Sequence, residues 1–143
     1  ILEQAIPDIK LNIVGDNSAP SLAAIGKDNV NFTGRVDSIE EIYNASRVFI
    51  APTRFAAGIP HKIHEAAAKG LPSVTTALLA QQLGWQDTKE LLVGDTPEAY
   101  AAQCIKLYQD QNIWQNVRVA GLTAIANDCS QEAFRKSLAG LFT

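Results

Sequence analysis

The sequence of 143 residues contains no methionine and only two cysteines, Cys104 and Cys129. Two cysteines cannot build a disulfide framework, so we expect a reduced, cytoplasmic chain. No basic segment followed by an apolar core opens the sequence, which gives no sign of a signal peptide. Because a translated chain starts with methionine and this one starts with Ile1, we interpret it as part of a longer protein.

The sequence also lacks a charge excess and a long hydrophobic run. Its 12 Lys and Arg against 15 Asp and Glu give a net charge of −3, which argues against a nucleic-acid partner. The longest charge-free run lies between Lys69 and Asp87, is slightly short for a membrane span and is interrupted by Pro72. There is no Gly-x-Gly-x-x-Gly, P-loop or Gly-x-Ser-x-Gly motif, which argues against the dinucleotide, P-loop and hydrolase classes.

Short apolar runs alternate with helical patterns along the chain. The runs predict strands at residues 10–14, 30–33, 47–51, 72–76 and 91–93. Helical patterns follow at 18–25, after the Ser38 capping box, at 61–69, and from Pro97 onward with breaks around Asp110 and 128–130. This alternation is typical of an α/β, Rossmann-like domain with a doubly wound parallel sheet. We therefore expect one domain over residues 1–143, with a helical tail over 97–143 and the first strand–helix unit missing.

The carboxyl ends of the strands are where ligands bind in such sheets. The segment after Ala51 is the most informative of them. A loop with Arg54 and Gly58 enters a helix that carries Lys62 and Glu65. Glycine allows the backbone to approach a ligand, and free N–H groups at a helix start bind phosphate. The pattern predicts an anion site at this helix start.

The local charge fits such a site. Between Ile42 and Gln86 the chain carries four cationic residues and one carboxylate, a local charge of +3. A basic pocket in an acidic domain suits a small anionic ligand better than a long polyanion. The alternative is that Gly58 only shapes a turn and that Arg54 and Lys62 are merely solvated.

An ordered set of motifs around this loop resembles the nucleotide-sugar-binding lobe of GT-B-fold glycosyltransferases, of the group called glycosyl transferases group 1 or family GT4. The residues that match the family's core motif are Pro52, Thr53, Gly58, Glu65, Ala66, Ala68, Gly70, Pro72 and Val74. Upstream, LNIVGD at 11–16 and VNFTGRV at 30–36 resemble two further family motifs. The resemblance covers about residues 9–110.

The resemblance implies a retaining transferase that moves a sugar from a nucleoside diphosphate to a hydroxyl acceptor, in bacterial polysaccharide or glycoconjugate synthesis. It implies that Arg54 and Lys62 stabilise the diphosphate as catalytic groups, without a metal or other cofactor, and that Glu65 binds the ribose. The turn at Gly34, Arg35 and Val36 would flank the base. The other nucleotide-sugar contacts are expected at Gly15, Gly58, Ile59, Pro60 and His61. The acceptor, and any peripheral membrane contact, would belong to an N-terminal lobe outside this chain.

Three departures from the family pattern stand out. Ala57 replaces the first of the family's two glutamates, so the contacts to the donor sugar must differ. Pro60 replaces a glycine, and Lys62 is an unusual charge at its position. The version formed by Arg54, Gly58, Ile59, Lys62 and Glu65 resembles a branch of bacterial surface-polysaccharide transferases. The family's Arg and Lys diphosphate clamp would lie before Ile1, so we expect Arg54 or Lys62 to substitute for it in part.

Other functions stay open on the sequence alone. A nucleotide-sugar epimerase of similar fold would need further carboxylates, and a non-catalytic interaction module is allowed by Ala57. A receiver-like domain needs an acidic cluster for which Asp16 is a poor substitute. His61 and His64 lack a third ligand for a metal site.

Among the remaining side chains, we expect Cys104, Trp85 and Trp114 to be packing residues.

Overall fold

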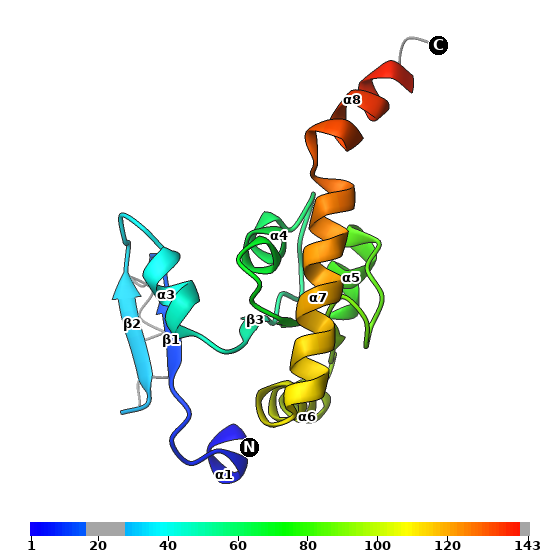
Figure 1. The fold of residues 1–143 in the computed structure, drawn as a ribbon. Helices are drawn as coiled ribbons and strands as arrows, with labels where there is room; N and C mark the ends of the chain where they lie inside the picture. Colours follow the sequence, from blue (N-terminus) through cyan, green and yellow to red (C-terminus); the bar gives the residue numbers. More distant parts are fainter. Residues whose placement is uncertain (17–27, 141–143) are drawn as a thin grey trace. The chain divides into compact units, whose positions relative to one another are not determined.

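The computed structural model of the chain describes residues 1–16 and 28–140, so the helix expected at 18–25 lies outside the described residues. The chain divides into two compact units, Ile1–Ala45 (unit 1) and Ser46–Thr143 (unit 2). Each unit has its own parallel sheet (Figure 1). The expected α/β class with parallel strands and a helical C-terminal part is confirmed, and the described strands pair as two sheets, one in each unit.

Unit 1 is built from α1 (Leu2–Ala5), β1 (Leu11–Val14), β2 (Val30–Gly34) and α3 (Glu40–Ala45). Strands β1 and β2 pair in parallel, in the positions that the sequence predicts. Helix α3 starts two residues after Ser38, whose hydroxyl accepts a hydrogen bond from the Glu40 N–H at 3.3 Å. Ser38 therefore bonds the first N–H of α3, whereas the capping-box spacing predicts a bond to the N–H of Glu41, one residue further on.

The sheet of unit 2 has the order β3–β4–β5, with all three strands parallel. The strands are β3 (Phe49–Ala51), β4 (Ser73–Thr75) and β5 (Leu92–Val93). They are shorter than the expected ranges, and β3 begins two residues later because Arg47 has other partners. The Arg47 carbonyl accepts a hydrogen bond from the Trp114 indole at 2.7 Å, and its guanidinium lies over the Tyr108 and Trp114 rings. Trp114 is thus a packing residue.

Five helices of unit 2 are α4 (His61–Ala68), α5 (Ala77–Leu83), α6 (Pro97–Gln109), α7 (Gln111–Asp128) and α8 (Gln131–Gly140). The breaks expected around Asp110 and 128–130 are confirmed. Asp110 starts α7, because its carboxylate accepts hydrogen bonds from the N–H groups of Asn112 and Ile113. Helix α5 is absent from the expected elements. Among the described residues, no helix is both long enough and apolar enough to cross a membrane.

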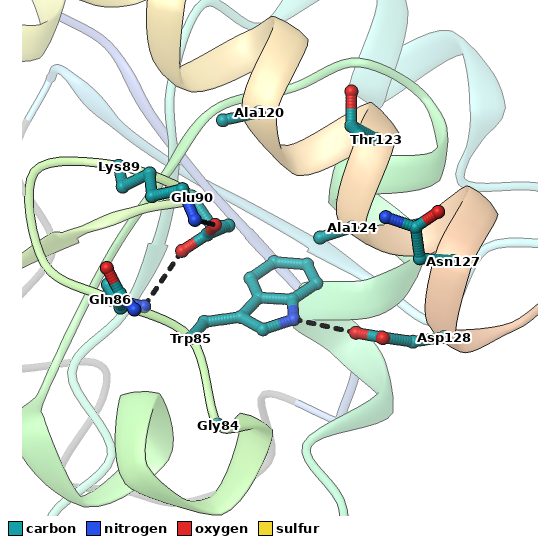
Figure 2. Close-up of a pocket in the computed structure, with 10 residues that line it drawn as sticks. All are labelled: Gly84, Trp85, Gln86, Lys89, Glu90, Ala120, Thr123, Ala124, Asn127 and Asp128. Atoms are coloured by element: carbon teal, nitrogen blue, oxygen red, sulfur yellow. Dashed lines mark hydrogen bonds and ion pairs between the residues drawn. The ribbon is translucent and has the colours of Figure 1, made fainter.

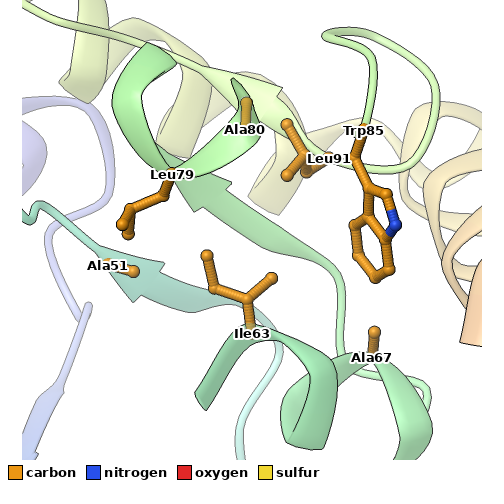
Figure 3. Close-up of a cluster of buried hydrophobic side chains, with 7 residues drawn as sticks. All are labelled: Ala51, Ile63, Ala67, Leu79, Ala80, Trp85 and Leu91. Carbon is orange, nitrogen blue, oxygen red and sulfur yellow. The ribbon is translucent and has the colours of Figure 1, made fainter. Parts of the chain in front are cut away.

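A buried hydrophobic cluster fixes α4 and α5 against the sheet (Figure 3). Ile63 on α4 and Leu79 on α5 are completely buried, and each contributes about 1.5–3 kcal/mol through burial. The cluster also contains Ala51, the last residue of β3, and Trp85, whose expected packing role is confirmed. The end of β3 and the start of α4 are therefore rigidly placed.

Helix α6 packs on the sheet through the half-buried Tyr100. The Tyr100 hydroxyl accepts a hydrogen bond from the Ala51 N–H at 2.9 Å and donates one to the Val74 carbonyl at 2.6 Å. One turn further on, Cys104 is buried, as expected, and burial raises the pKa of its thiol to about 11. The Tyr100 hydroxyl thus links the neighbouring strands β3 and β4.

Candidate functional site

Residues 52–60, the site loop, leave the sheet of unit 2 at the carboxyl end of β3. Ala51 pairs with Thr75, and Thr75 pairs with Val93, so the carboxyl ends of the three parallel strands lie at one edge. Ligands of open α/β sheets bind at this edge. The sequence predicted the segment after Ala51 as the site, and the structure places it where a ligand is expected.

Side chains from neighbouring elements hold the site loop in place. The Thr76 hydroxyl donates to the Thr53 carbonyl at 2.8 Å, and the Gln82 amide donates to the Ala56 carbonyl at 3.1 Å. The Lys62 ammonium donates to the Thr53 hydroxyl at 3.2 Å. Sequence reasoning missed Thr76 and Gln82, since neither stands in a motif. The only signal for Thr76 is its place directly after a strand.

Gly58 provides the backbone conformation that the loop needs before α4. Its φ of +86° lies in the left-handed region, and among the described residues no heavy atom beyond its two chain neighbours lies within 4 Å of the position that a Cβ would take. Pro60 is the N-cap residue of α4. Its ring is buried, whereas Ile59 is 59% exposed and His61 is exposed. The loop therefore presents its backbone to solvent ahead of the helix start.

Arg54, Lys62 and Glu65, the charged side chains predicted around the site loop, are all exposed in unit 2. Lys62 and Glu65 are three residues apart on α4, so they share a face of the helix. The ammonium of Lys62 contacts Thr53, the residue before Arg54. The structure thus brings Lys62 to the base of the site loop, with Arg54 in the loop itself. This arrangement can bind an anion through helix N–H groups and two cations.

The residues expected to contact the base lie in unit 1. Gly15 and Gly34 have φ values of +122° and +69°, and the Gly15 N–H donates to the Gly34 carbonyl at 2.8 Å. Arg35 and Val36 are exposed after β2. The joint use of these residues with the site loop is a prediction.

The two histidines of α4 do not form a metal site on their own. Among residues 1–16 and 28–140, no group of three His, Cys, Asp or Glu side chains could hold a metal ion. His64 is half-buried, with its ring centroid 5.4 Å from that of Trp85. Burial, and then the charge of His61, lower the pKa of His64, while Asp128 opposes this shift. The His64 ring packs against Trp85, a member of the buried cluster.

A separate open pocket of about 320 Å³ lies between the segment before β5 and α7 (Figure 2). Because this segment leads into the amino end of β5, the pocket lies away from the edge that carries the site loop. The Trp85 indole N–H donates to the Asp128 carboxylate at 3.1 Å. The Glu90 carboxylate accepts from the Gln86 N–H and from Lys89, each at 2.9 Å. Burial raises the pKa of Glu90, but the hydrogen bonds and the charge of Lys89 outweigh it and hold the pKa below its usual value. None of the predicted site residues lines this pocket.

Comparison with known proteins gives the family of the chain. Residues 1–110 match the family described as glycosyl transferases group 1. No match was found among curated proteins. The match covers well over half of the chain, including both β1–β2 and the site loop.

Two solved structures share the fold at low sequence identity. One is the pneumococcal O-GlcNAc transferase GtfA in complex with UDP and GlcNAc, with a TM-score of 0.77 and 19% identity. The other is AviGT4, a glycosyltransferase involved in avilamycin A biosynthesis, with a TM-score of 0.52 and 16% identity. Each alignment covers 97% of this chain, but the chain spans only 30% of the first protein and 46% of the second. The chain therefore belongs to glycosyl transferases group 1, and its α/β fold matches part of these glycosyltransferases.

Proposed function

We propose that this chain is the part of a glycosyltransferase that binds a nucleoside-diphosphate sugar. The observation that carries the proposal is the site loop at the carboxyl edge of three parallel strands, with Lys62 hydrogen-bonded to its base. Family membership gives the reaction class. The structure of GtfA with UDP and GlcNAc shows a fold of this kind in a protein that binds such ligands.

The chemistry follows from the charges around the loop. In the transfer, the bond between the sugar's anomeric carbon and the diphosphate oxygen breaks, a hydroxyl oxygen of the acceptor bonds to that carbon, and the hydroxyl proton is released. Negative charge then grows on the leaving diphosphate. Groups that are already oriented toward this charge lower the barrier. We propose that Lys62, Arg54 and the backbone N–H groups from Gly58 to His61 do this without a metal ion, and that the anomeric configuration is retained.

Positions 65 and 57 determine which further parts of the donor a carboxylate can contact. Glu65 is exposed one turn after His61, where its carboxylate can accept hydrogen bonds from the ribose hydroxyls. Ala57, in the site loop, offers no carboxylate to the sugar. In our proposal the base contacts Gly34, Arg35 and Val36, with Gly15 nearby. The parent protein would act in the cytoplasm in bacterial polysaccharide or glycoconjugate synthesis, with its acceptor bound by another lobe.

Amide chemical-shift titration of the 143-residue chain with UDP, GDP and ADP tests the proposal. We expect one nucleotide to shift amides from Gly58 to Glu65 and from Gly34 to Val36, which would also identify the base. Shifts in the first segment alone would contradict the role given to the second. If none of the three nucleotides moves these amides at millimolar concentration, the chain by itself is not a donor-binding unit.

A further inference from the structure

The site loop is held to unit 2 by side chains and not by backbone pairing. In the part of the chain that the structure describes, residues 53–58 form no hydrogen bond with another backbone group. Two side-chain hydrogen bonds end at Thr53, at the start of the loop. The third joins Gln82 of α5 to the Ala56 carbonyl in its middle. Gln82 is therefore the tether nearest to the glycine turn of the loop.

We propose that Gln82 is a positioning residue for the diphosphate site. Its amide Nε2 donates to the Ala56 carbonyl at 3.1 Å, two residues before Gly58. The bond to the Ala56 carbonyl fixes the backbone that leads into Gly58, whose φ is +86°. It thereby also fixes the direction of the N–H groups that follow and that would contact a ligand. The inference rests on the proposed function, since the ligand is the same nucleoside diphosphate.

The other atom of the same amide supports this role. Gln82 Oε1 is buried and has no hydrogen-bond partner among the described residues. Leaving a buried carbonyl oxygen unpaired is unfavourable, and an apolar side chain of similar size would avoid it. What glutamine supplies at this position is therefore the N–H donor to the loop. A side chain that served only to fill space between α5 and the loop would not need an amide.

Gln81 offers a matched control on the same helix. It precedes Gln82 on α5 and is exposed. We would prepare the 143-residue chain with Gln82→Leu and, separately, with Gln81→Leu, and record amide spectra of both without ligand. We expect the amides of residues 55–58 to shift in the Gln82 variant only. Its affinity for UDP, or for the base that the wild-type chain prefers, should fall about three- to tenfold, the usual effect of one hydrogen bond.

A second pair of variants separates positioning from simple packing. Gln82→Glu keeps the shape of the side chain but removes its N–H donor. Above its pKa, the introduced carboxylate repels the Ala56 carbonyl. Below it, the protonated carboxyl can donate to the carbonyl again. A glutamate carboxyl has an ordinary pKa of about 4.3, and burial beside a carbonyl raises it. We therefore expect the amides of 55–58 to return toward their wild-type shifts as the pH falls, with no such return in Gln81→Glu.

The outcomes distinguish the role of Gln82 in holding the site loop from the binding of the nucleotide by the chain. If both Gln82 variants leave the amides of 55–58 at their wild-type shifts, or if the Gln81 variants move them equally, the tether is refuted. If the loop amides move but the affinity for the nucleotide does not, Gln82 shapes the loop without positioning the site, which also overturns the inference. If the wild-type chain binds none of the nucleotides, the proposed function fails, whereas the ligand-free spectra still decide whether Gln82 holds the loop.

Discussion

At the scale of single residues, Lys62 is the cation that the structure connects directly to the site loop. Its ammonium donates to the Thr53 hydroxyl at 3.2 Å, beside the start of α4. We expect Lys62→Ala to weaken nucleotide binding about tenfold or more, because a hydrogen bond to a charged group contributes about 1.5–3 kcal/mol. The measurement is a titration with the nucleoside diphosphate that the wild-type chain prefers, beside the matching nucleoside monophosphate.

Lys69 provides the matched control for this substitution. It is exposed like Lys62 but lies at the C-cap of the same helix, at the end away from the site loop. Lys69→Ala removes the same charge, so a general electrostatic effect would weaken binding equally in the two variants. We expect the affinity of Lys69→Ala for the nucleotide to stay within about twofold of that of the wild type. The reason is that charges more than about 10 Å from a ligand are largely screened at moderate salt. Equal losses in both variants would argue against a specific role of Lys62.

At the scale of elements, two helices of unit 2 end in left-handed glycines with different surroundings. Gly70 follows α4 with a φ of +71°, and a Cβ there would lie 2.8 Å from the Arg118 side chain. Gly84 ends α5 with a φ of +70°, and in the part of the chain that the structure describes no atom beyond its two chain neighbours lies within 4 Å of the Cβ position. Alanine pays the same left-handed strain at both sites, about 1–2 kcal/mol. At position 70 it must also displace Arg118, which donates to the Gly70 carbonyl at 3.1 Å.

We therefore expect Gly70→Ala to destabilise unit 2 more than Gly84→Ala, by about 1 kcal/mol for the lost hydrogen bond. Urea unfolding followed by tryptophan fluorescence measures the difference, since both tryptophans lie in unit 2. The slope of the unfolding free energy with urea should stay the same in both variants. An equal loss at the two glycines would mean that Arg118 moves aside without cost.

Local patterns predicted the elements that frame the site, and long-range contacts explain what they missed. Helix α4 begins at His61 and stops before Gly70, as its sequence indicates, because a loop proline and a left-handed glycine mark its ends. Helix α5 was missed because its apolar residues continue directly from those of β4, which hides the change of period. Gln82 and Ala56 are 26 residues apart, and no motif or periodicity joins them.

At the scale of the whole molecule, the residues that report on folding lie together in one unit. Trp85, Trp114, Cys104 and Cys129 all belong to unit 2. Fluorescence and thiol chemistry therefore follow the unit that carries the site loop, and unit 1 has to be followed by amide spectra. This division lets the stability of unit 2 be measured in the full chain.

Alkaline pH should destabilise unit 2, because two weak acids, the buried Cys104 and the half-buried Tyr100, are partly removed from water in it. Burial raises the pKa of Cys104 from 9.0 to about 11 and raises that of Tyr100 well above its usual value. A group whose pKa is higher in the folded than in the unfolded state stabilises the fold. This contribution is complete at pH values below the unfolded-state pKa, and it is lost as the pH rises through the folded-state pKa. From about pH 9 to pH 11, the unfolded thiol loses its proton while the folded one keeps it. The free energy of unfolding should then fall by about 2 kcal/mol from Cys104 alone.

The two cysteines separate this titration from other alkaline effects. We would measure urea unfolding of unit 2 between about pH 8 and pH 10.5, a range chosen around these thiol pKa values, for the wild type, Cys104→Ala and Cys129→Ala. Cys104→Ala leaves a small cavity and so lowers the stability of unit 2 at every pH. Because the thiol is gone, the free energy of unfolding should fall less steeply with pH, below the range in which Tyr100 titrates. Cys129 is exposed, so its removal should leave the decline as steep as in the wild type. Parallel declines in all three proteins would show that the buried Cys104 thiol does not control the alkaline stability of unit 2.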